Sequence, residues 1–73
     1  MSAVVAIGSS RRLQGFALAG VDVRPAESPD DVPAAWAALG ADVGLLILTP
    51  EAAAVLEDVR AERQDVVWVT LSE

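Results

Sequence analysis

The sequence predicts an α/β fold with a four-stranded parallel sheet and three helices, and three observations lead to it. Four apolar segments alternate with segments of helical periodicity, which is the signature of βαβ units. Residues 3–7 and 43–48 are apolar at consecutive positions, as central strands covered on both faces are. Residues 21–24 alternate apolar with charged side chains and Pro25 follows, which is typical of an edge strand.

A first helix is expected after residue 8. Ser9 or Ser10 supplies its N-cap, and Gly20 suits the left-handed position that ends a helix. Gly15 inside the helix costs about 1 kcal/mol relative to alanine, so we expect it where the helix approaches the sheet closely. The side of the helix that faces the sheet is expected to carry Leu13, Phe16, Ala17 and Gly20.

The second helix is expected to begin at Asp30. This start places Pro33 in the first turn, where its missing N–H breaks no hydrogen bond. Gly40 is expected to end the helix, and Trp36 is expected in the core. The apolar face is predicted to comprise Val32, Ala35, Trp36 and Leu39.

The third helix has three start signals that agree: a capping hydroxyl at Thr49, Pro50 at the first helical position and Glu51 in the first turn. Arg60 and Arg63 are placed near its C-terminal end, where the helix dipole favours cations. Its apolar stripe is predicted to comprise Ala52, Val55, Leu56 and Val59.

The fourth strand is predicted at residues 66–71, which are apolar almost throughout. Right-handed crossovers then give the strand order 2-1-3-4, a flavodoxin-like sheet cut short. The first helix covers one face alone, and the second and third helices share the other. One side of the fourth strand should therefore be bare, and the isolated domain should self-associate or be poorly stable. The two alternating sets are Val66, Trp68 and Thr70 on one face and Val67, Val69 and Leu71 on the other.

Composition excludes several classes of function. Residues 1–73 fit one domain, and the absence of Cys, His, Lys and Tyr removes most catalytic constellations, so we expect neither enzyme activity nor a cofactor. A formal charge of -6 disfavours nucleic acid and anionic lipid as partners. No apolar run approaches the roughly 18 residues of a spanning helix, and the N-terminus lacks a secretion signal. We expect a cytoplasmic protein without direct membrane insertion.

A small-ligand site is an alternative that the residues leave open. The turn at residues 8–15 follows a strand and opens a helix, so its N–H groups and arginines could hold an anion. It lacks the glycine spacing of dinucleotide folds and the lysine of P-loops. The paired acids at 30–31 and 57–58 are better explained as solvated helix faces than as a metal site. A sensor site at the carboxyl ends of the strands would use Ser9, Ser10, Arg11, Thr49 and Glu51.

Three segments carry a resemblance to a known family: Ile7-Gly8 at the end of a strand, residues 15–21 (GFALAGV) and residues 42–51 (DVGLLILTPE). Together they resemble the F subunit of the archaeal and bacterial V/A-type (vacuolar-type) ATPases, over nearly the whole chain. The resemblance implies a central rotor-stalk component without a nucleotide site that binds the long helical hairpin of the D subunit. The family has an acidic residue where this chain has Ser9. It also has a C-terminal helix that we expect this chain to lack.

The resulting prediction is a non-catalytic protein-binding module that takes part in ATP-coupled proton or ion transport at the cytoplasmic face of a membrane. A ligand sensor and a free-standing, self-associating domain are the alternatives. The arginine pair is included among the partner contacts because arginine is enriched at interfaces. The candidate contact residues are Arg11, Arg12, Val67, Trp68, Val69 and Leu71.

Overall fold

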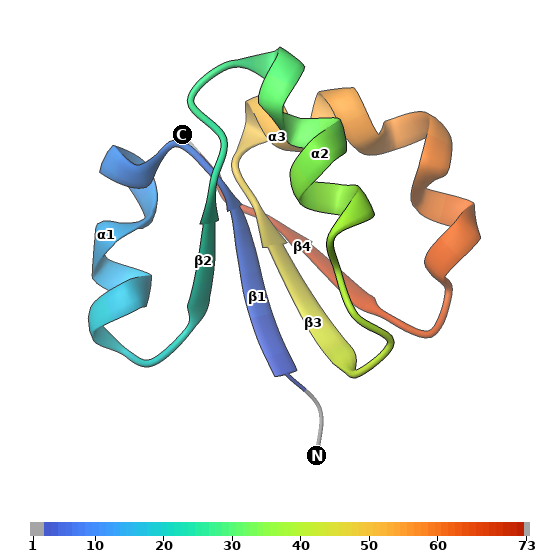
Figure 1. Cartoon of the computed structure of the whole chain (residues 1–73), viewed down its shortest axis with the longest axis horizontal. Helices are drawn as coiled ribbons and strands as arrows, with labels where there is room; N and C mark the ends of the chain where they lie inside the picture. The colour runs from blue at the N-terminus through green and yellow to red at the C-terminus, as the bar shows by residue number, and fades with distance from the viewer. Residues whose placement is uncertain (1–2, 73) are drawn as a thin grey trace.

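The computed structural model describes residues 3–72 as one sheet with helices on both faces (Figure 1). Its strands are parallel in the order β2-β1-β3-β4, which confirms the predicted fold and strand order. The strands are β1 (Ala3–Gly8), β2 (Asp22–Pro25), β3 (Val43–Leu48) and β4 (Val67–Thr70). The helices are α1 (Ser10–Leu18), α2 (Val32–Ala37) and α3 (Pro50–Leu56), with two 3₁₀ helices, η1 (Pro29–Asp31) and η2 (Glu57–Arg63).

The register of the sheet follows from two apolar central strands. β1 pairs with β2 between Val5 opposite Asp22 and Gly8 opposite Pro25, and β3 lies on its other side. β3 spans the predicted range, whereas the ranges of the two edge strands, β2 and β4, differ from the predicted ones. β2 is shifted by one residue toward Pro25, and β4 is one residue shorter at each end. Edge strands are held by hydrogen bonds on one side only, so their ends are less strictly fixed.

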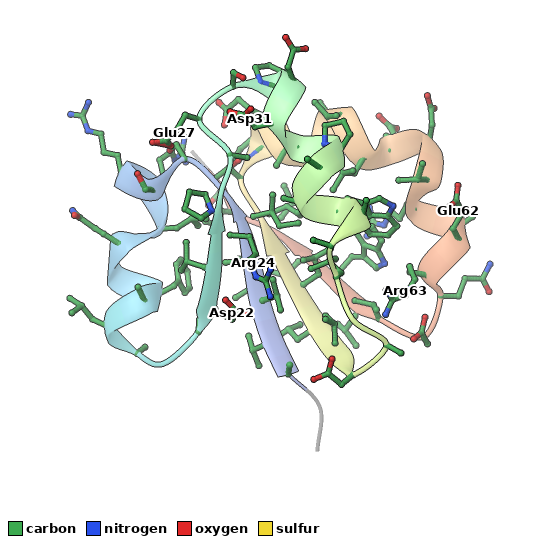
Figure 2. All side chains as sticks on the ribbon, viewed as in Figure 1. Asp22, Arg24, Glu27, Asp31, Glu62 and Arg63 are labelled. Atoms are coloured by element: carbon green, nitrogen blue, oxygen red, sulfur yellow. The ribbon has the colours of Figure 1, made fainter. Side chains whose placement is uncertain are left out.

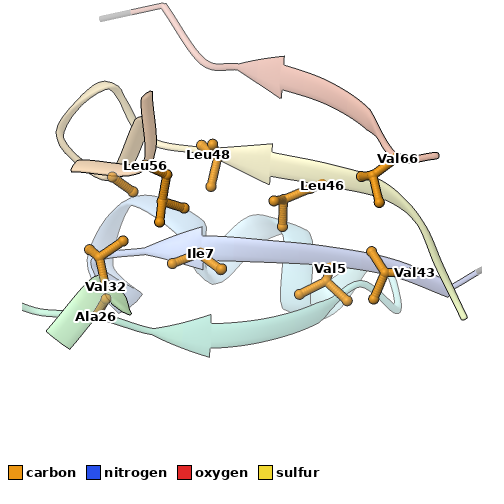
Figure 3. Packing of buried hydrophobic residues seen from close by; sticks show 10 residues of the cluster. Val5, Ile7, Ala26, Val32, Val43, Leu46, Leu48, Leu56 and Val66 are labelled. Carbon is orange, nitrogen blue, oxygen red and sulfur yellow. The ribbon is translucent and has the colours of Figure 1, made fainter. Parts of the chain in front are cut away.

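The core lies in two layers, one on each face of the sheet. On one face α2 and α3 cover the larger cluster, and Figure 3 shows its buried side chains, most of which come from the strands and from both helices. On the other face α1 stands alone, with Leu13 buried against Ala6 and Ile47. The predicted division of the helices between the two faces is confirmed. The larger cluster comprises Val5, Ile7, Ala26, Val32, Val43, Leu46, Leu48, Ala52, Leu56 and Val66.

The ends of α1 agree with the prediction, but the residues predicted to face the sheet from its middle do not all do so. Ser9 is the N-cap and accepts from the Arg12 N–H at 3.4 Å, and Gly20, with φ 90°, ends the helix. Gly15 does not lie at a close approach, because a Cβ built there meets nothing within 4 Å. It follows Leu13 by two residues, about 200° round the helix, and so faces away from the sheet. Ala17 is also exposed, contrary to the prediction.

The start of α2 is later than predicted. Residues 29–31 form the 3₁₀ turn η1, and α2 begins at Val32 rather than Asp30. The Asp31 carboxylate accepts from the Ser28 hydroxyl at 3.2 Å instead of capping the helix. Pro33 does lie in the first turn, as its missing N–H requires.

The end of α2 also differs from the prediction. The helix stops at Ala37, and Gly40 has no left-handed backbone, so it is not the terminating residue. A Cβ at Gly40 would lie 2.7 Å from Asp42 Oδ1, so the glycine makes room for that side chain in the turn into β3. The predicted apolar face is correct: Val32 is buried, and Ala35, Trp36 and Leu39 pack on the larger cluster.

α3 begins as predicted and then tightens. Thr49 caps it through its hydroxyl, which accepts from the Ala52 N–H at 3.3 Å, and Pro50 is the first helical residue. The α-helix ends at Leu56, and the segment predicted to continue it as far as the arginines is the 3₁₀ helix η2. Runs of 3₁₀ helix longer than four residues are uncommon, so this segment of seven is an unusual feature.

Candidate protein-interaction surface

The two faces of β4 and its flanking residue Val66 differ in exposure. Val66, directly before it, is 6% exposed and belongs to the larger core cluster, whereas Val67 is 61% exposed and Val69 41% exposed. The prediction that one of the two alternating sets would be bare is therefore confirmed for Val67 and Val69, whereas Leu71, the third member of that set, is half-buried. Which set it is follows from the structure: Val67 and Val69 lie on the α1 side of the sheet, the side with a single helix.

The exposed valines of β4 continue an apolar row across the sheet. Val4 of β1 pairs with Leu45 of β3, and Leu45 pairs with Val67 of β4. Val4 is 36% exposed, and Leu45 is half-buried. These residues form what we call the uncovered strip: Val4, Leu45, Val67 and Val69. Val4 and Leu45 were not among the sequence candidates, although one helix on a four-stranded face leaves β3 partly bare as well as β4.

Trp68 lies on the opposite face, apart from the exposed valines. Its ring packs against Trp36 of α2 with 5.2 Å between centroids, and the Arg60 guanidinium lies 5.5 Å from its centroid. Its indole N–H donates to the Arg63 carbonyl at 3.1 Å. Trp68 therefore joins β4 to α2 and η2. The structure divides the predicted contact set, since Trp68 does not share a surface with Val67 and Val69.

The arginine pair lies close to the end of β4. Arg11 and Arg12 are exposed on the first turn of α1, and Arg12 Nη2 donates to the Ser72 carbonyl at 3.5 Å. Leu71 is half-buried against the smaller core cluster, and its N–H donates to the Leu48 carbonyl at 2.8 Å. In Figure 1 the C-terminal end of the chain accordingly lies beside the start of α1. Candidates from opposite ends of the sequence, Arg12 and Leu71, are thus brought to one side of the sheet.

A second feature lies at the carboxyl edge of the sheet. A hollow of about 260 Å³ is lined by residues that include Ser9, Arg12, Glu27, Thr49 and Glu51. Three of these, Ser9, Thr49 and Glu51, were predicted for a ligand sensor. Two carboxylates and one guanidinium border the hollow, so its charge does not favour an anion.

The Glu27 carboxylate already occupies the N-terminus of α1. Its Oε1 accepts from the Ser10 N–H, and its Oε2 accepts from the Ser10 hydroxyl, both at 2.9 Å. Figure 2 shows Glu27 reaching that end of the helix. Because helix N-termini attract anions through free N–H groups and the helix dipole, the chain's own carboxylate takes the place that a phosphate would need. The sequence analysis did not identify this role for Glu27.

Charged groups elsewhere form local pairs rather than a reactive site. Arg24 pairs with Asp22 at 3.0 Å, and Arg63 pairs with Asp65 at 3.3 Å. The hydrogen bond from Arg63 holds the pKa of the Asp65 carboxyl below its ordinary value. Within residues 3–72, acidic side chains do not gather in threes as a metal site requires, and α1, α2 and α3 are too short to cross a membrane.

Comparison with known proteins adds one match. The chain matches no model of a protein family, and no curated protein sequence matches it. The crystal structure of the V-type ATP synthase F subunit from Archaeoglobus fulgidus superimposes with a TM-score of 0.72, covering 99% of this chain and all of that one. This chain has the fold of that protein. The two sequences are 21% identical, so the match establishes the shared architecture, including the parallel 2-1-3-4 sheet.

Proposed function

We propose that the chain is a non-catalytic component of the central stalk of a V/A-type rotary ATPase, where it binds a partner protein. The observation that supports this most strongly is the superposition on the archaeal F subunit over nearly the whole chain. It agrees with the sequence resemblance in residues 15–21 and 42–51. As part of such a complex the chain would act at the cytoplasmic face of the membrane, in ATP-driven proton or ion transport.

The proposed partner is the helical-hairpin D subunit of the same ATPase. An exposed apolar strip beside a helix suits a long helical partner, because apolar patches on small domains mark interfaces. A partner would also add buried area to a domain of 73 residues, whose own core gives limited stability. The lack of Cys, His, Lys and Tyr supports a binding role over catalysis.

Co-expression with the D subunit of the same organism tests this proposal. We expect the two chains to co-purify, to migrate as one species in sedimentation at micromolar concentration, and to be present in equal numbers. A full-length, folded D subunit that fails to bind this chain at about 50 µM would contradict the proposal. A helical-hairpin protein unrelated to rotary ATPases is the control, and it should not bind.

A small-ligand sensor remains a second candidate, favoured by the hollow at the carboxyl edge of the sheet, where open α/β folds bind ligands. The carboxylates of Glu27 and Glu51 point to a ligand with a positively charged group rather than a phosphate. Melting temperature in the presence of amino acids and polyamines tests this candidate. A specific upward shift that is lost in Glu51→Gln would favour the sensor function.

A further inference from the structure

The geometry of the α1 side leaves room for one more helix. α1 packs on β2 and β1, and in Figure 3 it lies behind β1, away from β4 at the far edge of the sheet. α1 also reaches β3, where Ile47 is buried against Leu13, so the bare part of this face comprises β4 and the half-buried Leu45 of β3. An α-helix with its side chains is about 10 Å across, and neighbouring strands are about 4.8 Å apart. A single helix lying along β4 beside α1 would therefore cover the uncovered strip.

Charge is distributed unevenly between the two sides of the sheet. α1 itself carries Arg11 and Arg12 and no acidic residue. The Glu27 carboxylate lies at its N-terminus on Ser10, but neither arginine takes part in an ion pair among residues 3–72. The opposite layer, from η1 through α2 and α3 to η2, is acidic, and Figure 2 shows Glu62 pointing outward from η2. That layer carries Asp30, Asp31, Glu51, Glu57, Asp58 and Glu62 against Arg60 and Arg63.

The local charge beside the uncovered strip, and not the net charge of the chain, decides its occupant. A second copy or a flat anionic membrane would present a broad surface to the whole chain, whose net charge of -6 repels both. Three partly exposed valines also fall far short of the roughly 800 Å² per partner that a stable dimer buries. An elongated protein helix can instead cover the valines and extend along α1, with acidic side chains near the arginines.

We propose that the uncovered strip, together with Arg11 and Arg12, is the docking surface for an acidic amphipathic helix of the partner protein. The apolar side of that helix lies over Val67, Val69 and Leu45, and its carboxylates reach the two guanidinium groups. This inference deepens the proposed function and rests on it for the existence of a helical partner. It assigns binding to the α1 side of the sheet and leaves the acidic layer free.

The first test uses the complex with the D subunit and matched variants. Val67→Asp and the double variant Arg11→Glu/Arg12→Glu should each weaken binding by about tenfold or more, since each places a negative charge at the proposed contact. Val67→Thr keeps the β-branched shape and should weaken binding less. The matched controls, Ala34→Asp in α2 and Glu57→Arg in η2, change charge on the opposite layer and should leave the Kd within about twofold.

The outcomes separate this inference from the proposed function. Suppose that the hairpin partner binds the wild-type chain and that its binding is weakened by the controls on the acidic layer and not by the α1-side variants. In that case the proposed docking surface is wrong and the stalk function stands. If the hairpin partner does not bind at all, the stalk function fails, and a second probe decides the surface. Circular dichroism of each variant confirms that it is folded.

The second probe is a pair of designed helical peptides with the same leucine face and either glutamate or lysine on the flanks. In NMR titrations of the isolated chain we expect the glutamate peptide to shift the amide signals of Val67, Val69 and Arg11, but not that of Ala34. The lysine peptide should bind about tenfold more weakly, and added salt should lower the affinity of the glutamate peptide. Three results would overturn the inference: tighter binding of the lysine peptide, binding of the chain to phosphatidylglycerol vesicles through the same valines, or dimerisation of the chain through these valines.

Discussion

The indole rings of Trp36 and Trp68 pack against each other, 5.2 Å apart and tilted by 36°, and so join α2 to β4. Trp68 is an edge-strand residue, so this contact fixes a strand that otherwise pairs only with β3. The Arg60 guanidinium lies over the same ring, and the Arg63 carbonyl accepts its N–H. The tryptophan pair therefore stabilises the folded domain, and removing it should lower the stability of the chain rather than act directly on partner binding.

Trp68→Ala should lower the free energy of unfolding by about 2–3 kcal/mol, because it removes a partly buried aromatic ring and its contact with Trp36. Denaturation followed by circular dichroism measures the change. The double variant with Trp36→Ala should show a coupling energy of about 1 kcal/mol. Additive effects of the two substitutions would mean that the stacking contributes nothing of its own.

Gly8→Ala should destabilise the domain by about 2 kcal/mol or more. A Cβ at Gly8 would overlap Thr49 Cγ2 and lie 2.7 Å from Thr49 Oγ1, and Thr49 is the buried cap of α3. Thermal unfolding gives the change. Gly15→Ala is the matched control with the opposite sign. Its Cβ meets nothing, and the gain in helix propensity should stabilise the domain by about 0.5–1 kcal/mol.

Glu27→Ala should lower the free energy of unfolding by about 1 kcal/mol, because the Ser10 N–H at the start of α1 loses its charged acceptor. Glu62→Ala, an exposed acid on η2, should change it by less than about 0.5 kcal/mol. Urea denaturation of both variants makes the comparison. Equal effects would show that Glu27 does not support α1.

The intact chain should not bind Mg-ATP with sub-micromolar affinity. It has no lysine to reach the β/γ-phosphates, and Glu27 fills the N-terminus of α1. Calorimetric titration tests this expectation. A saturable sub-micromolar signal would contradict both the protein-binding assignment and the interpretation of Glu27.

The Asp65 carboxyl should titrate below its ordinary pKa of 3.8, chiefly because Arg63 donates a hydrogen bond to it. A pKa that is lower in the folded chain gives a stabilising contribution that is present above the unfolded pKa and lost as pH falls through the folded one. NMR titration of the carboxyl carbon measures it. In Arg63→Gln the pKa should move up toward 3.8, and an unchanged pKa would show that Arg63 is not the cause.

The sequence predicted the regular elements well where a local signal was decisive. Thr49 and Pro50 start α3 as predicted, since a capping hydroxyl and a proline act within one turn. Gly20 ends α1 for the same reason. Gly15 and Gly40 were misinterpreted, because a glycine can reflect a close approach, a turn or neither, and only the neighbouring atoms decide which.

By itself the sequence determined the alternation of strands and helices, the strand order and the fact that one side of the fourth strand is bare. Hydrophobic periodicity reveals the elements, and the right-handedness of the crossovers limits the order of the strands. The tertiary structure alone decided that Val67 and Val69 are bare while Trp68 is packed, and that Glu27 lies against Ser10. These outcomes depend on register and on contacts between distant segments. Both alternating sets of side chains in the fourth strand are largely apolar, so the sequence does not tell which set is buried. Only packing against α1, α2 and α3 distinguishes the two faces.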